Sequence, residues 1–237
     1  MRKVFLFVLL LLIGLTAVLV FNTVTLKTKQ LVSANGVPLQ LPVDSHAVQH
    51  LSSAIQINTV SSADSVKMEL VRPRFDSFIQ FLKVTYPLVF SSLQDTVING
   101  RNILLKWQGS NESLAPAILY AHMDVVPVEQ NTLAQWKHNA FSGDVADGYI
   151  WGRGALDDKG SLISLFEALN RSLQHGFKPL RTIYIASGSD EEVGGATGAE
   201  SIAQYCRNQK LHFGFYMDEG LLVAQGVVPD IKRDVAF

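Results

Sequence analysis

The stretch ILYAHMDVVPV, residues 118–128, shows how this chain combines its core with its polar residues. An apolar run leads directly into His122 and Asp124, and Pro127 then ends the run. Side chains two residues apart on a β-strand point to the same face. We therefore expect a buried strand that presents an imidazole and a carboxylate side by side at its end. Functional sites are laid out in this way.

Strand and helix patterns alternate around this stretch. Upstream, the spacing of apolar residues predicts helices over 45–57 and 75–82, the second starting after a break at Pro73. Downstream helices are predicted over 161–173 and 198–209, and strands over 102–109, 116–122, 181–187 and 212–219. Strands of continuous apolar residues separated by helices indicate a sheet buried on both faces. The predicted fold class is therefore α/β with a mostly parallel central sheet.

The bulk composition excludes some classes of protein. The chain has 237 residues, 48% hydrophobic and 17% charged, which is ordinary for a globular protein with a substantial core. The net charge of −1 and the absence of a Lys/Arg block argue against nucleic-acid binding. Cys206 is the only cysteine, so no intrachain disulfide can form.

The N-terminus is a hydrophobic segment. Residues 4–21 form an uncharged run of 18 residues preceded by Arg2 and Lys3, long enough as a helix to approach the thickness of the bilayer core. It is longer than a usual signal-peptide core and lacks a clear cleavage site, so a signal-anchor and a cleaved signal peptide both remain open. Either one puts the body outside the cytosol, in the secretory lumen, the vacuole or lysosome, or the medium. The predicted organisation is a signal segment over 1–26, a linker over 27–44 and a catalytic domain over 45–237.

Polar residues, most of them acidic, follow the ends of the predicted strands, which include a further strand over 148–156. In order, these are His122 with Asp124, Asp157 with Asp158, Asp190 to Glu192, and Asp218 with Glu219. The spacing between the groups approaches one βαβ unit, about 30 residues. In an open α/β sheet, ligands bind outside the carboxyl ends of the strands. We therefore expect these groups to meet in one crevice.

Several carboxylates in one crevice repel each other unless cations lie between them. An imidazole with carboxylates suits zinc, and also manganese or cobalt, and the excess of acidic ligands favours two ions bridged by a carboxylate such as Asp157. Adjacent Glu191 and Glu192 cannot both face one ion, which suggests one ligand and one free base. Taken singly, each motif is more simply a surface turn, a helix cap or a solvated acidic loop. Only the occurrence of these motifs together favours a metal-binding site.

Four blocks resemble a known family. AHMDVVPV (121–128), WKHNAFSGDVADGYIWGRGALDDKG (136–160), SGSDEEVGG (187–195) and YMDEG (216–220) are similar to the metallopeptidases and amidohydrolases that include carboxypeptidase S, aminoacylase and glutamate carboxypeptidase. The residues of these blocks are most similar to those of the carboxypeptidase S and N-fatty-acyl-amino-acid synthase/hydrolase branch of the family. The resemblance implies a three-layer, zinc-exopeptidase-like fold.

The resemblance also implies roles for individual residues. His122 and Asp218 would bind one zinc, Asp157 would bridge two zincs, and Glu192 would bind the second. Glu191 would be the general base, and Asp124 would orient His122. The peptide bond between Asp157 and Asp158 would be cis. The reaction would be hydrolysis of the amide bond of an N-acyl amino acid or of a C-terminal peptide bond.

The resemblance also leaves features unmatched. Family members continue with a lid or dimerisation domain and a late histidine that completes the second zinc site, and neither is found in these 237 residues. We therefore expect an incomplete second site, a chain inactive by itself, and a homodimeric full-length relative. A non-catalytic, membrane-tethered binding protein and a zinc aminopeptidase remain the alternatives. Asn111 and Asn170 each begin an Asn-x-Ser glycosylation pattern.

Overall fold

The computed structural model describes residues 2–25, 44–219, 223–224 and 235–236. The chain divides into two units, Met1–Pro42 and Val43–Phe237. The predicted linker over 27–44 lies outside the described residues except for Asp44.

The described residues of the first unit form helix α1 (Arg2–Thr25), whose side chains are all exposed. This helix is long and apolar enough to cross a membrane, and a signal sequence would meet the same criterion. It therefore fits both alternatives left open above, a signal peptide and an anchor.

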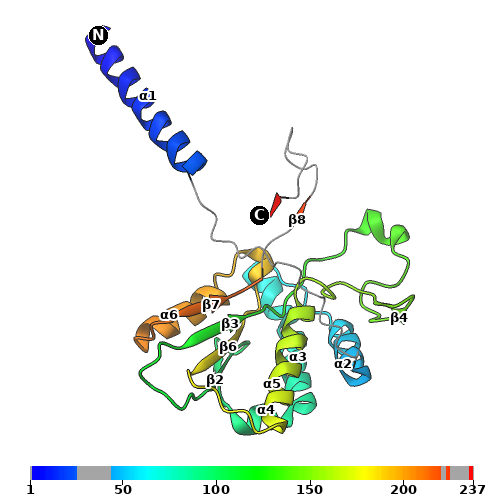
Figure 1. Ribbon diagram of the computed structural model, residues 1–237. Coiled ribbons are helices and arrows are strands. Elements are labelled where there is room, and N and C mark those ends of the chain that lie inside the picture. Colours follow the sequence, from blue (N-terminus) through cyan, green and yellow to red (C-terminus); the bar gives the residue numbers. More distant parts are fainter. Residues whose placement is uncertain (1, 26–43, 220–222, 225–234, 237) are drawn as a thin grey trace. The chain divides into compact units, whose positions relative to one another are not determined.

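In the second unit, a five-stranded sheet lies between helices (Figure 1). Its strands, in spatial order, are β1 (Gln94–Ile98), β2 (Asn102–Trp107), β6 (Ile183–Ser187), β3 (Ala117–Tyr120) and β7 (Phe215–Met217). The pairs β3–β6 and β3–β7 are parallel, whereas β1–β2 and β2–β6 are antiparallel. The α/β class is thus confirmed, but the sheet is mixed and not mostly parallel. The reason is that β1 and β2 form a hairpin, which needs no helical crossover.

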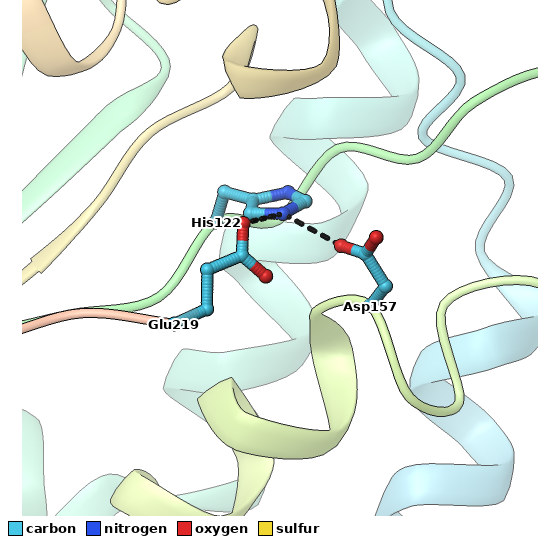
Figure 2. Close-up of side chains that lie close together, drawn as sticks. All are labelled: His122, Asp157 and Glu219. Atoms are coloured by element: carbon cyan, nitrogen blue, oxygen red, sulfur yellow. Dashed lines mark hydrogen bonds and ion pairs between the residues drawn. The ribbon is translucent and has the colours of Figure 1, made fainter. Parts of the chain in front are cut away.

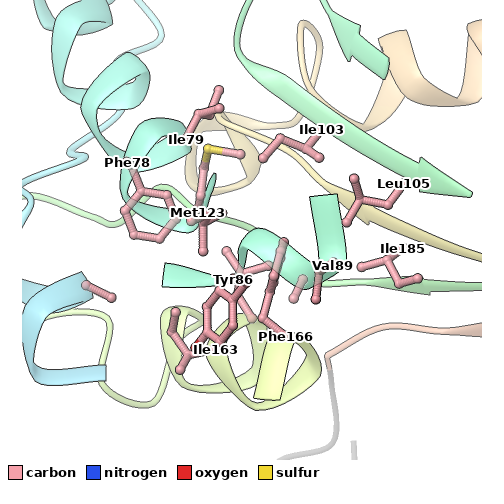
Figure 3. Packing of buried hydrophobic residues seen from close by; sticks show 14 of the residues in the cluster. Phe78, Ile79, Tyr86, Val89, Ile103, Leu105, Met123, Ile163, Phe166 and Ile185 are labelled. Atoms are coloured by element: carbon pink, nitrogen blue, oxygen red, sulfur yellow. The ribbon is translucent and has the colours of Figure 1, made fainter. Parts of the chain in front are cut away.

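The larger core lies on the face of the sheet covered by four helices. These are α2 (Ser45–Gln56), α3 (Ser65–Thr85), α4 (Pro87–Ser92) and α5 (Lys159–Gln174). Ile103 and Leu105 of β2 and Ile185 of β6 face these helices, and Figure 3 shows them packed with Phe78, Tyr86 and Phe166.

The opposite face of the sheet carries a smaller core. Alternate strand residues, among them Leu104, Ile118 and Tyr184, pack there against Ile202 and Cys206 of α6 (Ala199–Asn208). Both faces of the three central strands β2, β6 and β3 are therefore covered, which explains their continuous apolar residues and gives the predicted three layers, whereas β7 and most of β1 are exposed.

The prediction of a helix beginning only after Pro73 was wrong. Helix α3 begins at Ser65, where Asp64 caps it by accepting hydrogen bonds from the backbone N–H groups of Val66 and Lys67, and it runs through Pro73. A proline inside a helix removes one backbone hydrogen bond. Burial of Met68 two turns before the predicted start extends the apolar face formed by Phe75 and Phe78, and outweighs that loss.

The stretch before Asp157 was also assigned wrongly. It does not form a strand of the central sheet. Residues Tyr149–Ile150 form β5, which pairs only with β4 (Val145–Ala146) in a separate two-stranded ribbon. Asp157 therefore lies in the loop that leads into α5. Strand β1 and helix α4 were not predicted, and a further pair joins β8 (Val223–Ala224) to β9 (Val235–Ala236).

Candidate metal centre

His122 is held rigidly just after β3. Its side chain is fully buried, and its Nδ1 lies 3.0 Å from the backbone oxygen of Asp124 and 3.3 Å from Asp124 Oδ1. Its backbone N–H donates to Asp158 Oδ2 at 3.2 Å. Because Nδ1 contacts Asp124 inside the protein, Nε2 is the ring nitrogen that faces the carboxylates of the site.

Three carboxylates surround that nitrogen. Asp157 Oδ1 lies 3.0 Å and Glu219 Oε1 3.2 Å from His122 Nε2, as Figure 2 shows. Glu191 Oε2 is 3.6 Å from the same nitrogen. Ligand atoms of His122, Asp157 and Glu219 all lie within 4.8 Å of one another, close enough to hold one metal ion.

Parallel pairing explains why these residues meet. Tyr120 of β3 is paired with Ala186 of β6, and past the strand end the N–H of Met123 still donates to the oxygen of Gly188. The chain segments that follow β3 and β6 therefore leave the sheet at the same edge. Strand β7 pairs with β3 on its other side and ends at Met217, just before Asp218 and Glu219.

Asp124 joins two of these segments. Its carboxylate is fully buried, and it accepts hydrogen bonds from the backbone N–H groups of Glu191 and Glu192, both at 3.1 Å. One carboxylate thus positions the imidazole of His122 and fixes the backbone that carries the two glutamates. Sequence reasoning found only the first of these roles, because the second depends on a contact between distant segments.

Lys159 joins the loop of Asp157 to α2. Its ammonium group is buried and donates to the backbone oxygens of Ala54, at 2.9 Å, and Ile57, at 2.5 Å. It also lies 4.9 Å from the centroid of the Phe78 ring. The peptide bond between Asp157 and Asp158 is cis, as the resemblance implied. No signal in the sequence indicated that this lysine would be buried.

Burial, with a smaller contribution from neighbouring carboxylates, raises the pKa values of the three glutamates of the site. Burial raises the pKa of Glu219 to about 7, with His122 opposing the rise and Asp157 adding to it. The pKa values of Glu191 and Glu192 are also raised, in both cases chiefly by burial. The environment of these three glutamates therefore disfavours their negative charge, which a bound cation would stabilise.

The raised pKa of His122 favours its charged form, whereas the raised pKa values of the glutamates favour their neutral forms. Burial by itself lowers the pKa of His122, but the hydrogen bond and negative charge of Asp124 outweigh it, and Glu219 adds to the rise, so that the pKa is raised to about 10. The surroundings of this ring therefore favour a positive charge. A metal cation at Nε2 would meet the same favourable field.

The structure brings together some of the predicted residues and not others. His122, Asp157 and Glu191 lie around one point. The carboxylate of Asp218 instead accepts a hydrogen bond from the Tyr216 hydroxyl at 2.8 Å. Glu192 belongs to no three-ligand group among the described residues. The ligand roles of Asp218 and Glu192 therefore stay predictions.

Glu219 is a site residue to which the sequence analysis assigned no role. It adjoins Asp218, and neighbouring side chains on an extended chain point to opposite faces, so only one of the two can face His122. The adjacent pair of acids was the available signal. Which of them turns inward depends on the register of β7 against β3.

The chain belongs to the peptidase family M20/M25/M40, whose model matches residues 118–235. It is 38% identical to a probable carboxypeptidase S-like 2 of Dictyostelium discoideum, over 95% of this chain and 44% of that protein. It is 41% identical to the N-fatty-acyl-amino acid synthase/hydrolase PM20D1 of Xenopus tropicalis, over 80% of this chain and 36% of that protein. The chain thus spans less than half the length of these relatives.

A solved structure supports the fold. An M20 family metallo-carboxypeptidase from Sulfolobus solfataricus superposes with a TM-score of 0.59 at 21% identity, over 75% of this chain and 38% of that one. The M20 family is metal-dependent, and the group of His122, Asp157 and Glu219 is a candidate metal-binding group in this chain.

Proposed function

We propose that this chain carries the metal-binding part of an M20 hydrolase that cleaves the amide bond of N-acyl amino acids or the C-terminal peptide bond of peptides. The observation that carries the proposal is the convergence of His122, Asp157 and Glu219 on one point, with Glu191 beside it. The names of the Dictyostelium and Xenopus relatives support this substrate class.

The donor set fits zinc. One imidazole nitrogen and carboxylate oxygens are common zinc ligands, and the buried Asp124 behind His122 is the partner that such a histidine usually has. We assign the first ion to His122, Asp157 and Glu219, with Asp218 as the alternative to Glu219. We assign the second ion to Asp157 and Glu192, as the family resemblance implies.

The chain's own residues would then divide the work. Bound zinc lowers the pKa of water towards about 7 and polarises a carbonyl group. Glu191, whose side chain is 41% exposed, accepts the proton of the attacking water and returns it to the leaving amine. Its raised pKa suits it to both transfers. Asp124 keeps Glu191 in place through the backbone, and the products are a carboxylic acid and a free amino acid.

The N-terminal helix bears on where this reaction takes place. Helix α1 has the length and composition of a signal sequence or an anchor. We propose that the body acts outside the cytosol, in the secretory pathway, in a vacuole or lysosome, or after secretion.

The first test is zinc binding to the whole 237-residue chain, measured as bound metal per folded protein. We expect zinc to bind, and binding to weaken in Asp157→Asn and Glu219→Gln but not in Glu200→Gln, a remote acidic residue on α6. Loss in Asp218→Asn with Glu219→Gln unaffected would assign the ligand to Asp218. A folded chain without zinc would favour a non-catalytic binding protein.

The second test concerns the substrate. Hydrolysis by a full-length relative should be greater for N-acyl amino acids than for amides with a free N-terminus. Changing the glutamate of that relative that matches Glu191 to glutamine should abolish hydrolysis while leaving zinc bound. Preference for a free N-terminus would instead identify an aminopeptidase. Because the second zinc site is expected to be incomplete here, the 237-residue chain by itself should show no hydrolysis in the same assay.

A further inference from the structure

The loop between β2 and β3 contains a motif that the proposed function does not use. Asn111, Glu112 and Ser113 form an Asn-x-Ser pattern, and all three residues are exposed. The backbone N–H of Asn111 donates to the oxygen of Leu180 at 2.8 Å. The loop is therefore anchored to the body of the protein while its side chains remain accessible.

The asparagine and the serine interact with each other. Asn111 Oδ1 accepts hydrogen bonds from the Ser113 hydroxyl at 2.7 Å and from the Ser113 backbone N–H at 3.0 Å. The hydroxyl draws electron density from the amide oxygen and so makes the amide N–H groups more acidic. In the described part of the chain, Asn111 Nδ2 makes no hydrogen bond, so this nitrogen is available for reaction.

The second Asn-x-Ser pattern differs in its location, its exposure and the contact between its asparagine and serine. Asn170 and Ser172 lie inside α5, and Asn170 is half-buried. Side chains two residues apart on a helix do not face each other, so Ser172 cannot donate to the Asn170 amide. The neighbouring Leu169 is part of the larger core, and a sugar on Asn170 would interfere with that packing.

We propose that Asn111 is an acceptor for N-linked oligosaccharide and that Asn170 is not. A bond forms between Asn111 Nδ2 and the anomeric carbon of the sugar, and the bond from that carbon to the diphosphate of a lipid-linked donor breaks. The electron pair leaves with the diphosphate, and Nδ2 loses a proton. The transfer requires the body to cross a membrane, which agrees with an apolar helix preceded by Arg2 and Lys3.

A glycan at this position would also cover apolar surface. Leu180, whose backbone oxygen binds Asn111, is 69% exposed, and the nearby Phe177 is 55% exposed. Phe177 packs edge-on against Trp107 at the end of β2, with ring centroids 5.7 Å apart. Glycans are bulky and solubilising, so the modification would shield this patch.

The test is expression of the whole chain in a eukaryotic secretory system, followed by peptide-N-glycosidase treatment and peptide mass spectrometry. We expect a one-step decrease in apparent mass, absent in Asn111→Gln and in Ser113→Ala but retained in Asn170→Gln. An unmodified wild-type chain, or a shift that disappears only in Asn170→Gln, would overturn the proposal.

A control variant reports whether the body reaches the transferase. Phe141→Thr creates an Asn-Ala-Thr acceptor at Asn139, an exposed residue whose Oδ1 accepts a hydrogen bond from the backbone N–H of residue 141 as Asn111 does from Ser113, and it is tested in the Asn111→Gln background. Modification at Asn139 with none at wild-type Asn111 would contradict the assignment directly. Absence of modification at both positions would also contradict it, because the body would then not be translocated.

Discussion

The two halves of the candidate metal centre differ in how they are held. On one side, the side chains of His122 and Asp124 are fully buried, and His122 Nδ1 contacts both the backbone oxygen and the carboxylate of Asp124. On the other side, the side chains of Asp157, Glu191 and Glu219 are 63%, 41% and 31% exposed. The buried half is part of the folded core, whereas the exposed half consists of like charges facing one nitrogen.

Because the two halves differ in burial, substitutions in the buried half should affect the stability of the fold, and substitutions in the exposed half should affect metal binding. Removing a buried, hydrogen-bonded charge leaves its partners without compensation and destabilises the fold. Removing an exposed carboxylate from a cluster relieves repulsion and costs the fold little, but takes away a ligand. The four experiments below should therefore separate into effects on unfolding and effects on metal.

The largest effect is expected for Asp124→Ala. It leaves the N–H groups of Glu191 and Glu192 without their acceptor and removes the buried negative charge beside the His122 ring, so the free energy of unfolding should fall by about 3–5 kcal/mol. Urea denaturation without metal measures this. The control is Asp144→Ala, whose half-exposed carboxylate pairs with His138 and should contribute no more than about 1 kcal/mol. Equal losses in both variants would show that burial does not distinguish the two aspartates.

Zinc should stabilise the chain through the exposed half. At a free zinc concentration about 100 times Kd, the free energy of unfolding should rise by about 2.7 kcal/mol. Glu219→Gln should remove most of this increase at the same zinc concentration, yet leave metal-free stability unchanged or slightly higher. Denaturation with and without zinc measures both quantities, with Glu200→Gln as the matched exposed control. A large loss of metal-free stability in Glu219→Gln would mean that this carboxylate belongs to the structural half.

Two lysines extend the comparison beyond the metal centre. Lys159→Met takes the lysine donor away from the backbone oxygen of Ile57 and leaves that of Ala54 with the N–H of Ile57 alone, which should cost about 1–3 kcal/mol of unfolding free energy. Lys137→Met removes an exposed pair with Asp147 and should cost less than about 1 kcal/mol. Thermal or urea unfolding of the two variants side by side measures the difference, and a reversed order would contradict it.

The smallest effect concerns an exposed carboxylate paired with a buried cation. The hydrogen bond from Arg101 lowers the pKa of Glu69 from 4.5, so ionised Glu69 stabilises the fold above that pH. The contribution is lost as pH falls from 4.5 through the lower folded-state value. Glu69→Gln should therefore be less stable than wild type at neutral pH, and the difference should vanish in acid. A difference independent of pH would show that the charge is not involved.

Local patterns in the sequence predicted most of the secondary structure. The helices α2, α5 and α6 and the strands β2, β3, β6 and β7 lie where apolar periodicity placed them. The exceptions have tertiary causes. Helix α3 continues through Pro73 because its apolar face is buried, and residues Tyr149–Ile150 pair outside the central sheet.

The candidate site was predictable to a similar degree. His122 and Asp124 could be placed because alternation along one strand determines their common direction. Asp157 was correctly included for a wrong reason, since it follows a loop and not a strand of the sheet. The choice between Asp218 and Glu219 could not be made, because their spacing in the chain is the same whichever of them turns inward.

The sequence by itself determined the α/β class and the buried strand that ends in His122 and Asp124, because both follow from the local periodicity of apolar residues. It also determined which acidic residues follow the strands. The tertiary structure alone decided that Asp124 also holds the backbone of Glu191 and Glu192, that Lys159 is buried against α2, and that Glu219 faces His122. These contacts join segments far apart in the chain, and the pairing of β3 with β6 and β7 brings most of them together.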